Sequence, residues 1–164
     1  MAIRLFITGG TFDKEYDLIN GRLYFTDTHV HEILQRGRNT TPVHTTTLMM
    51  IDSLDMTPAD RERIVSECIR SAEPHIIITH GTDTMVDTAL ALQQQNIPKT
   101  IVLTGAMIPY TFGSSDGLFN MGSAMAFVQC LPIGVYIVMN GRHFPAHNVR
   151  KNRQTGYFEP LQDE

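Results

Sequence analysis

The residues most clearly placed for chemistry in this sequence are Thr82 and Asp83, in the stretch HGTDTM at residues 80–85. An apolar run at 76–78 leads into this stretch, and a helix-like pattern at 84–95 follows it. A strand that ends in a glycine turn and opens a helix puts polar side chains at the carboxyl edge of a sheet, where open α/β folds bind ligands. We therefore expect a hydroxyl and a carboxylate there, among the backbone N–H groups of a helix start.

Two other predicted strand ends carry similar groups, namely Thr11 after the first strand and Asp52 and Ser53 after the second. Each has a plain structural interpretation. A threonine at a strand-to-helix turn usually caps the helix, and Asp83 fits equally well as a first-turn carboxylate favoured by the helix dipole. The recurrence of such groups at three strand ends of one sheet edge favours a ligand or catalytic site.

Hydrolysis by an activated hydroxyl fits these residue types best. A threonine hydroxyl is a weak nucleophile and needs a base nearby. Tyr16 lies on the same polar loop as Thr11 and can close over it, but it serves equally well as an apolar anchor for the loop. A tyrosine with an unperturbed pKa of about 10 needs a cationic neighbour to act as a base. Thr82 and Asp83 call for a lysine, whose neutral form can take a proton and whose charge the carboxylate would stabilise.

Nucleotide and metal sites are disfavoured. The glycine pair at 9–10 lacks the G-x-G-x-x-G spacing, and the chain contains no G-x-x-x-x-G-K motif. His29 and His31 are two residues apart and face different sides of a helix. His80 and Asp83 lack an obvious third ligand. We expect neither a cofactor nor a metal.

The elements that position these residues alternate between strands and helices. Apolar runs predict strands at 3–7, 43–51, 75–79, 101–103 and 133–139. Capping residues and helical periodicity predict helices at 27–36, 57–73, 84–95 and 116–129, with Ile69, Leu90 and Phe119 among the buried positions. This order is typical of a parallel sheet with helices on both faces. We predict a three-layer α/β/α, flavodoxin-like domain with five main strands.

Composition sets the broad class. The chain has 164 residues, 42% hydrophobic and 18% charged, which predicts one soluble globular domain. Its net charge of -4 argues against nucleic acid or an anionic membrane as the main partner. We expect no signal peptide and no membrane span. Cys68 and Cys130 are expected to be buried free thiols in a reducing cytoplasm.

Two segments fall outside the alternation. Residues 11–27 predict a mobile loop with a small hairpin at the turn dipeptide 20–21, of a length often found in lids. The tail at 141–164 carries four positive charges without an acid between 142 and 153. Its polar character predicts a poor core element, an arm that packs against another subunit. We therefore divide the chain into an α/β domain at 1–140 and this C-terminal arm.

Four motifs in this order closely resemble the bacterial-type L-asparaginase family: TGGT at 8–11, DSLDM at 52–56, HGTDTM at 80–85 and LTGAM at 103–107. DG at 116–117 and the strand ending VMN at 138–140 extend the resemblance. It implies an amidohydrolase that cleaves the side-chain amide of L-asparagine to aspartate and ammonia without a metal or cofactor. It also implies the fold of the family's N-terminal domain.

The resemblance assigns roles to the residues singled out above. Thr11 corresponds to the primary nucleophile and Tyr16 to its loop partner. Thr82 corresponds to the second threonine, and Asp83 to the aspartate that holds the substrate's α-amino group.

The substrate-binding assignments follow in the same way. Asp52 and Ser53 correspond to the segment that grips the α-carboxylate. Backbone N–H groups near the two threonines would stabilise the oxyanion, which adds Gly10 and Gly81 to the substrate-binding set.

The sequence departs from the family at three points. Full-length members are longer and carry a smaller C-terminal domain that completes a neighbour's site, so this chain resembles a short-chain form. Leu54 stands where many relatives have glutamine, which implies different recognition of the α-carboxylate. The family's lysine is expected in the helix after 116–117, but residues 117–132 contain none. Lys151 is our candidate, with Lys14 second; a solvated surface charge is an equally good interpretation.

We expect a cytoplasmic short-chain L-asparaginase that forms a homodimer or a larger homo-oligomer. Two alternatives stay open. The first is a related amidase with another substrate, such as glutamine. The second is a catalytically silent amino-acid-binding regulatory module.

Overall fold

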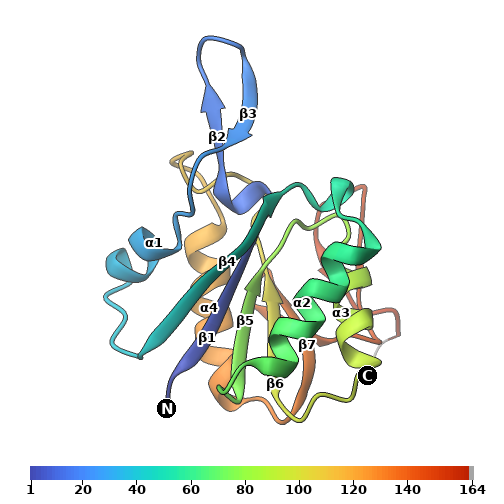
Figure 1. Cartoon of the computed structure of the whole chain (residues 1–164). Coiled ribbons are helices and arrows are strands. Elements are labelled where there is room, and N and C mark those ends of the chain that lie inside the picture. Colours follow the sequence, from blue (N-terminus) through green and yellow to red (C-terminus); the bar gives the residue numbers. More distant parts are fainter. Residues whose placement is uncertain (163–164) are drawn as a thin grey trace.

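The fold is built on a six-stranded sheet, seen in the computed structural model, which describes residues 1–162 (Figure 1). The strands lie in the order β4 (Val43–Ile51), β1 (Ile3–Gly9), β5 (His75–Thr79), β6 (Thr100–Thr104), β7 (Gly134–Met139) and β8 (Arg142–Pro145). The first five are parallel, and β8 pairs antiparallel with β7. The predicted flavodoxin-like arrangement is confirmed, and β8 adds a strand that we did not predict.

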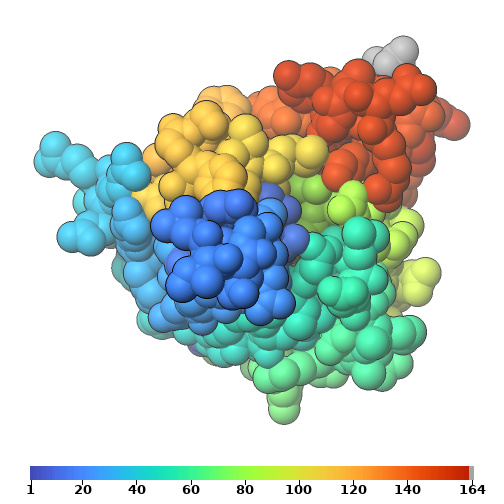
Figure 2. Space-filling view, turned by 90° about the horizontal axis from the view of Figure 1, so that it is seen from above, coloured from blue at the N-terminus to red at the C-terminus, as the bar shows by residue number. Residues whose placement is uncertain are grey.

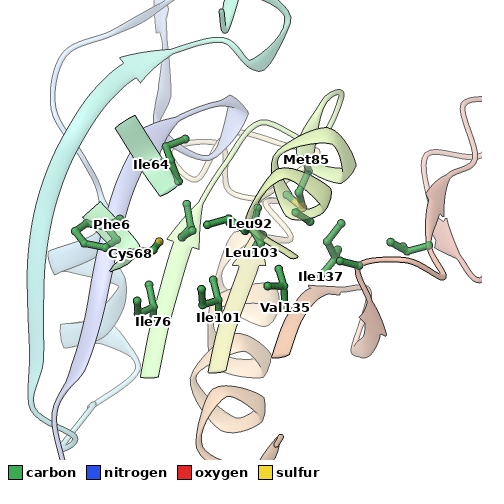
Figure 3. Close-up of a cluster of buried hydrophobic side chains, with 14 of the residues drawn as sticks. Phe6, Ile64, Cys68, Ile76, Met85, Leu92, Ile101, Leu103, Val135 and Ile137 are labelled. Atoms are coloured by element: carbon green, nitrogen blue, oxygen red, sulfur yellow. The ribbon is translucent and has the colours of Figure 1, made fainter. Parts of the chain in front are cut away.

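Helices cover both faces of the sheet (Figure 1). Helices α2 (Pro58–Arg70) and α3 (Met85–Gln93) lie on one face, and α1 (Val30–Arg36) and α4 (Gly117–Cys130) on the other. The core between the sheet and the first pair is shown in Figure 3, with Ile64 and Leu92 facing strand residues such as Ile76. Because both faces are covered, the central strands are continuous apolar runs instead of alternating patterns.

The helix starts show which capping signals were informative. Thr57 and Asp60 form the predicted capping box, in which the Thr57 backbone N–H donates to Asp60 Oδ2 at 2.8 Å. The predicted start of α1 at residues 27–28 is wrong, because the helix begins at Val30. Asp13 binds that region instead, since its carboxylate accepts hydrogen bonds from the Thr28 hydroxyl and from the His29 backbone N–H.

On the helices, more apolar residues were predicted to be buried than the structure buries. Ile69, Leu90 and Phe119 are exposed by 53%, 37% and 63%, so their predicted burial is wrong. Each helix packs only one face on the sheet, and these residues lie beside that face. Both cysteines are free, as predicted, but only Cys68 is buried and Cys130 is exposed.

A two-stranded hairpin fills most of the predicted loop at 11–27. The 3-10 helix η1 (Thr11–Asp13) follows β1 and leads into β2 (Lys14–Asp17), which pairs with β3 (Arg22–Phe25). The turn contains Gly21 at φ 64°, and this confirms the predicted hairpin. The hairpin projects from the sheet edge where β1 ends (Figure 1).

The C-terminal tail is part of the core, so the prediction of a poor core element is wrong for its described residues. After β8 come two short strands, β9 (Arg150–Lys151) and β10 (Phe158–Glu159), which pair antiparallel with each other. Four apolar side chains of the tail are at most 3% exposed and join the core on the α2–α3 face: Phe144, Ala146, Val149 and Phe158. They are scattered among other residues at irregular spacings, so no strand or helix period marks them in the sequence. Residues 163–164 lie outside the described part.

No helix within residues 1–162 has the length and apolar character needed to cross a membrane.

Candidate active site

The loops after β1, β4 and β5 are in direct backbone contact at the carboxyl edge of the sheet. A Cβ atom at Gly10, where φ is +77°, would lie 2.4 Å from the backbone nitrogen of Gly81. A Cβ atom at Gly81 would lie 2.6 Å from Cβ of Ser53. Both positions need glycine for this approach. In Figure 2, the blue N-terminal segment, the teal segment after β4 and the red tail border the same face.

Lys151 reaches this edge from strand β9 and joins the loop after β5. Its Nζ atom donates to Thr82 Oγ1 at 2.8 Å and to Asp83 Oδ1 at 2.9 Å. The side chain of Lys151 is 11% exposed, and Thr82 is 6% exposed. The structure thus brings three of the predicted residues within hydrogen-bond distance, although Lys151 lies 69 positions from Thr82.

Arg153 is a fourth member of this cluster, and we did not predict it. Its Nη1 atom donates to Asp83 Oδ1 at 2.8 Å, and its Nη2 atom donates to the main-chain oxygen of Asp83 at 2.9 Å. The hydrogen bond from Lys151 is the main reason why the pKa of the Asp83 carboxyl lies below its ordinary value. Partial burial opposes this shift and the Arg153 guanidinium adds to it. Asp83 is therefore a carboxylate held by two cations.

Asp52 and Lys14 form a second charged pair at the same edge. Lys14 Nζ donates to Asp52 Oδ2, and the backbone N–H of Leu54 donates to Asp52 Oδ1 at 3.0 Å. Burial raises the pKa of Asp52, but these two hydrogen bonds outweigh it and hold the pKa below its ordinary value. Asp52 caps the 3-10 helix η2 (Ser53–Asp55) in this way. Lys14 contacts Asp52 and makes no hydrogen bond with Thr82, so the two candidate lysines occupy different places.

Ser53 fixes the loop after β4 against the loop after β5. It is 1% exposed. Its Oγ atom accepts from the backbone N–H of Thr84 at 3.3 Å, and its main-chain oxygen accepts from the Thr84 hydroxyl at 2.8 Å. Ser53 thus joins the two loops, whatever else it binds.

Thr11 and Tyr16 are not hydrogen-bonded to each other in this conformation. Thr11 begins η1, is partly exposed, and follows the glycine that contacts Gly81. Tyr16 lies on β2 and is 49% exposed. Its hydroxyl lies beside the hairpin turn, 3.7 Å from the position of a Cβ on Gly21. The structure brings Thr11 to the shared edge and leaves Tyr16 on the projecting hairpin.

His80 is a buried support of the loop after β5 that we did not assign a role from the sequence. Its Nδ1 lies 2.7 Å from the main-chain oxygen of Gly81, and its Nε2 lies 2.8 Å from Thr88 Oγ1. Because a carbonyl can only accept, Nδ1 carries the proton and Nε2 accepts from the Thr88 hydroxyl. Burial is the main cause that lowers the pKa of His80 to about 4, so the ring is neutral.

Two asparagines fasten the tail that carries Lys151. The Asn120 side chain accepts from the Asn140 backbone N–H at 3.2 Å and donates to the Gly105 oxygen at 2.9 Å. Asn140, at φ 57°, accepts from the backbone N–H of Phe158 at 3.0 Å through Oδ1. Phe158 in turn pairs with Lys151 across the β9–β10 ribbon. The position of Lys151 is therefore set through helix α4 and the end of β7.

Among residues 1–162, no group of three or more histidine, cysteine, aspartate or glutamate side chains is arranged to hold a metal ion.

Comparison with known proteins gives consistent matches. The family profile described as "Asparaginase, N-terminal" matches residues 2–159. L-asparaginase 1 of Escherichia coli is 30% identical over 166 residues, covering 95% of this chain and 49% of that protein. The solved structure of the thermostable L-asparaginase from Thermococcus kodakarensis matches with a TM-score of 0.85 and 28% identity, covering 100% of this chain and 52% of that one. A glutamyl-tRNA(Gln) amidotransferase component from Pyrobaculum aerophilum is 32% identical, covering 82% of this chain and 34% of that protein. The chain spans about half the length of the L-asparaginases that it matches.

Proposed function

The chain belongs to the asparaginase family, and from this premise we propose that it is an amidohydrolase that converts L-asparagine and water to L-aspartate and ammonia. The observation that carries the proposal is the contact of Lys151 Nζ with both Thr82 Oγ1 and Asp83 Oδ1, at 2.8 and 2.9 Å. A hydroxyl, an amine and a carboxylate in this order can move a proton to and from a reacting group. All three groups come from this one chain.

In the proposed reaction, Thr11 Oγ attacks the side-chain amide carbon of the substrate. The carbon–nitrogen bond breaks, the hydroxyl proton leaves with ammonia, and water then cleaves the ester on Thr11 to release aspartate. Thr82 activates the Thr11 hydroxyl in the first step and the water molecule in the second, with Lys151 in its neutral form as the proton acceptor. Backbone N–H groups near Gly10 and Gly81 stabilise the negative oxygen that develops on the carbonyl.

Substrate binding uses the two charged pairs. Lys151 and Arg153 engage Oδ1 and the main-chain oxygen of Asp83, which leaves Oδ2 to accept the substrate's α-ammonium group. Asp52 and Ser53 belong to the segment that meets the α-carboxylate, with Lys14 neutralising Asp52. Tyr16 closes over Thr11 when the hairpin bends toward the sheet edge.

The test is ammonia release by the purified chain and its Thr11→Ala variant. We expect turnover of L-asparagine by the wild type and a loss of about 1,000-fold or more in kcat for the variant, because the variant lacks the attacking hydroxyl. Thr41→Ala, in the loop before β4 at the opposite end of the sheet, is the matched control and should keep wild-type turnover. Near-normal hydrolysis by Thr11→Ala would refute the assignment of the nucleophile.

Glutamine amide chemistry is the second candidate, favoured by the similarity to the amidotransferase component. The rates of ammonia release from L-asparagine and from L-glutamine, measured side by side, distinguish an asparaginase from a glutamine amidase. A catalytically silent amino-acid-binding module is the remaining alternative. It would release no ammonia from either amide but would show a higher melting temperature in the presence of L-asparagine.

A cytoplasmic location and a homo-oligomeric state stay predictions, as does the division at residue 140. Light scattering on the purified chain tests the oligomeric state, and a monomeric mass would contradict it.

A further inference from the structure

The guanidinium of Arg153 is fixed by two hydrogen bonds although its side chain is 64% exposed. It donates to Asp83 Oδ1 at 2.8 Å and to the main-chain oxygen of Asp83 at 2.9 Å. A guanidinium has five N–H donors in one plane. Two are used on Asp83, so three remain to donate to other groups.

Arg153 also keeps its positive charge whatever the protonation state of Lys151. Lys14 pairs with Asp52, and Lys151 and Arg153 share Asp83. When Lys151 is neutral, as the proposed reaction requires, Arg153 is the cation that remains on Asp83. Its planar guanidinium fork matches the geometry of a carboxylate.

The loop after β4 does not supply an equivalent donor from its side chains. Leu54 brings an apolar side chain that is 67% exposed. The Ser53 hydroxyl is 1% exposed and lies against the backbone N–H of Thr84, so burial keeps it from a ligand at the surface. Asp52 is itself an anion that Lys14 neutralises. Of the three cationic side chains at this edge, Arg153 is the most exposed, at 64% against 17% for Lys14 and 11% for Lys151. Its unused N–H donors are therefore the most accessible to a ligand.

We propose that Arg153 is a specificity-determining residue that anchors the substrate's α-carboxylate, so that the site selects ω-amides with a free α-carboxylate. The inference rests on the proposed function, in which Asp83 receives the α-ammonium group. The carboxylate and the ammonium of an α-amino acid share one carbon atom. A guanidinium fixed on Asp83 is consequently within reach of the carboxylate when the ammonium meets Asp83 Oδ2.

The test compares L-asparagine with its α-methyl ester, which keeps the side-chain amide and loses the negative charge. We expect the wild type to show a KM about 10- to 100-fold higher for the ester, the range of a charge-assisted hydrogen bond. In Arg153→Gln, the KM for L-asparagine should rise by a similar factor and approach that of the ester. Its kcat should fall much less, since the carboxylate is bound equally in the ground and transition states.

Arg150→Gln is the matched control. Arg150 is 62% exposed and lies beside Lys151 on the same strand, but its Nε donates to Glu159 at 2.8 Å. The variant removes the same charge from the same tail and should keep both KM values. An Arg153→Gln enzyme with wild-type KM and full discrimination against the ester would overturn the inference while leaving the proposed function intact.

Calorimetric titration with L-aspartate separates the two proposals if no ammonia is released. Aspartate binding to the wild type and to Arg150→Gln, lost or weakened at least 10-fold in Arg153→Gln, would support the anchor without any turnover. Equal binding to all three proteins, or binding to none, would overturn it.

Discussion

Acidification should destabilise this protein through one buried imidazole, that of His80. The ring is completely buried, and its two nitrogens are occupied by the Gly81 oxygen and the Thr88 hydroxyl. Adding a proton would place a charge in the core and break the acceptor role of Nε2 toward Thr88. The folded protein therefore resists protonation of His80 far more strongly than the unfolded chain does.

The size of the effect follows from the pKa of about 4 in the folded state and the ordinary value of 6.5. Between these values the unfolded chain binds the proton and the folded protein does not, so the free energy of unfolding falls as the pH falls. His80 contributes a loss of about 2 kcal/mol at pH 5 relative to pH 8. The loss levels off at about 3 kcal/mol below pH 4, where both states are protonated.

The measurement is urea unfolding at pH 8, 7, 6 and 5 for the wild type and for His80→Gln. Glutamine can donate to the Gly81 oxygen and accept from the Thr88 hydroxyl, but it does not titrate. Between pH 8 and pH 5, we expect the free energy of unfolding of the variant to fall by about 2 kcal/mol less than that of the wild type. Every other titrating group is common to the two proteins, so the difference isolates residue 80.

If the free energy of unfolding depended on pH in the same way for the two proteins, this reasoning would be refuted, even if the variant were less stable at every pH. The carboxyls with lowered pKa values, Asp52 and Asp83, lose their stabilisation only as the pH falls from about 4 toward their folded pKa values. They cannot mimic the expected loss between pH 6.5 and pH 5.

Two further changes test how the site is held. Gly10→Ala should lower turnover of L-asparagine at least 10-fold, because a Cβ at this position, where φ is +77°, would lie 2.4 Å from the backbone nitrogen of Gly81. Gly113→Ala is the control and should keep wild-type turnover, since the space around its added methyl group is open. Equal turnover of the two variants would contradict the contact between Gly10 and Gly81. Asn140→Ala should cost about 1–2 kcal/mol in urea unfolding, since it loses the hydrogen bond to Phe158 and must hold a φ of 57°. Asn140→Gly keeps the backbone conformation and should cost less; equal losses in the two variants would show that φ is irrelevant there.

The sheet could be predicted from the sequence because its five parallel strands are apolar runs separated by strong helix signals. The Thr57–Asp60 capping box and the hairpin turn at Gly21 are local features, readable within a few residues. The three loops that meet at the sheet edge followed from the same topology. Side-chain burial on the helices was harder to predict, since Phe119 and Leu90 fit the helical period of apolar residues but lie beside the face that packs on the sheet.

The tail could not be predicted because its structure depends on distant partners. Strands β9 and β10 have two residues each, too short for any periodic pattern. Lys151 was a candidate because residues 117–132 contain no lysine, but its contact with Thr82 spans 69 positions and could not be predicted. Arg150 and Arg153 are both exposed arginines of the tail, and only the folded structure shows that one pairs with Glu159 and the other with Asp83. His80 was visible as a polar residue after a strand, but its burial depends on α3 covering it.

The β9–β10 ribbon gives this molecule a weak point that coincides with its chemistry. Lys151 and Arg153 are attached to the body through one short ribbon, which is held at its two ends by the buried side chains of Val149 and Phe158 and by the hydrogen bond from Phe158 to Asn140. Regions with few buried contacts open locally at free energies well below that of global unfolding. A transient opening of the ribbon would carry both cations away from Asp83 while the sheet stayed folded. The fraction of molecules competent for the proposed reaction would then be set by this local equilibrium, and a ligand that engages the ribbon would close it.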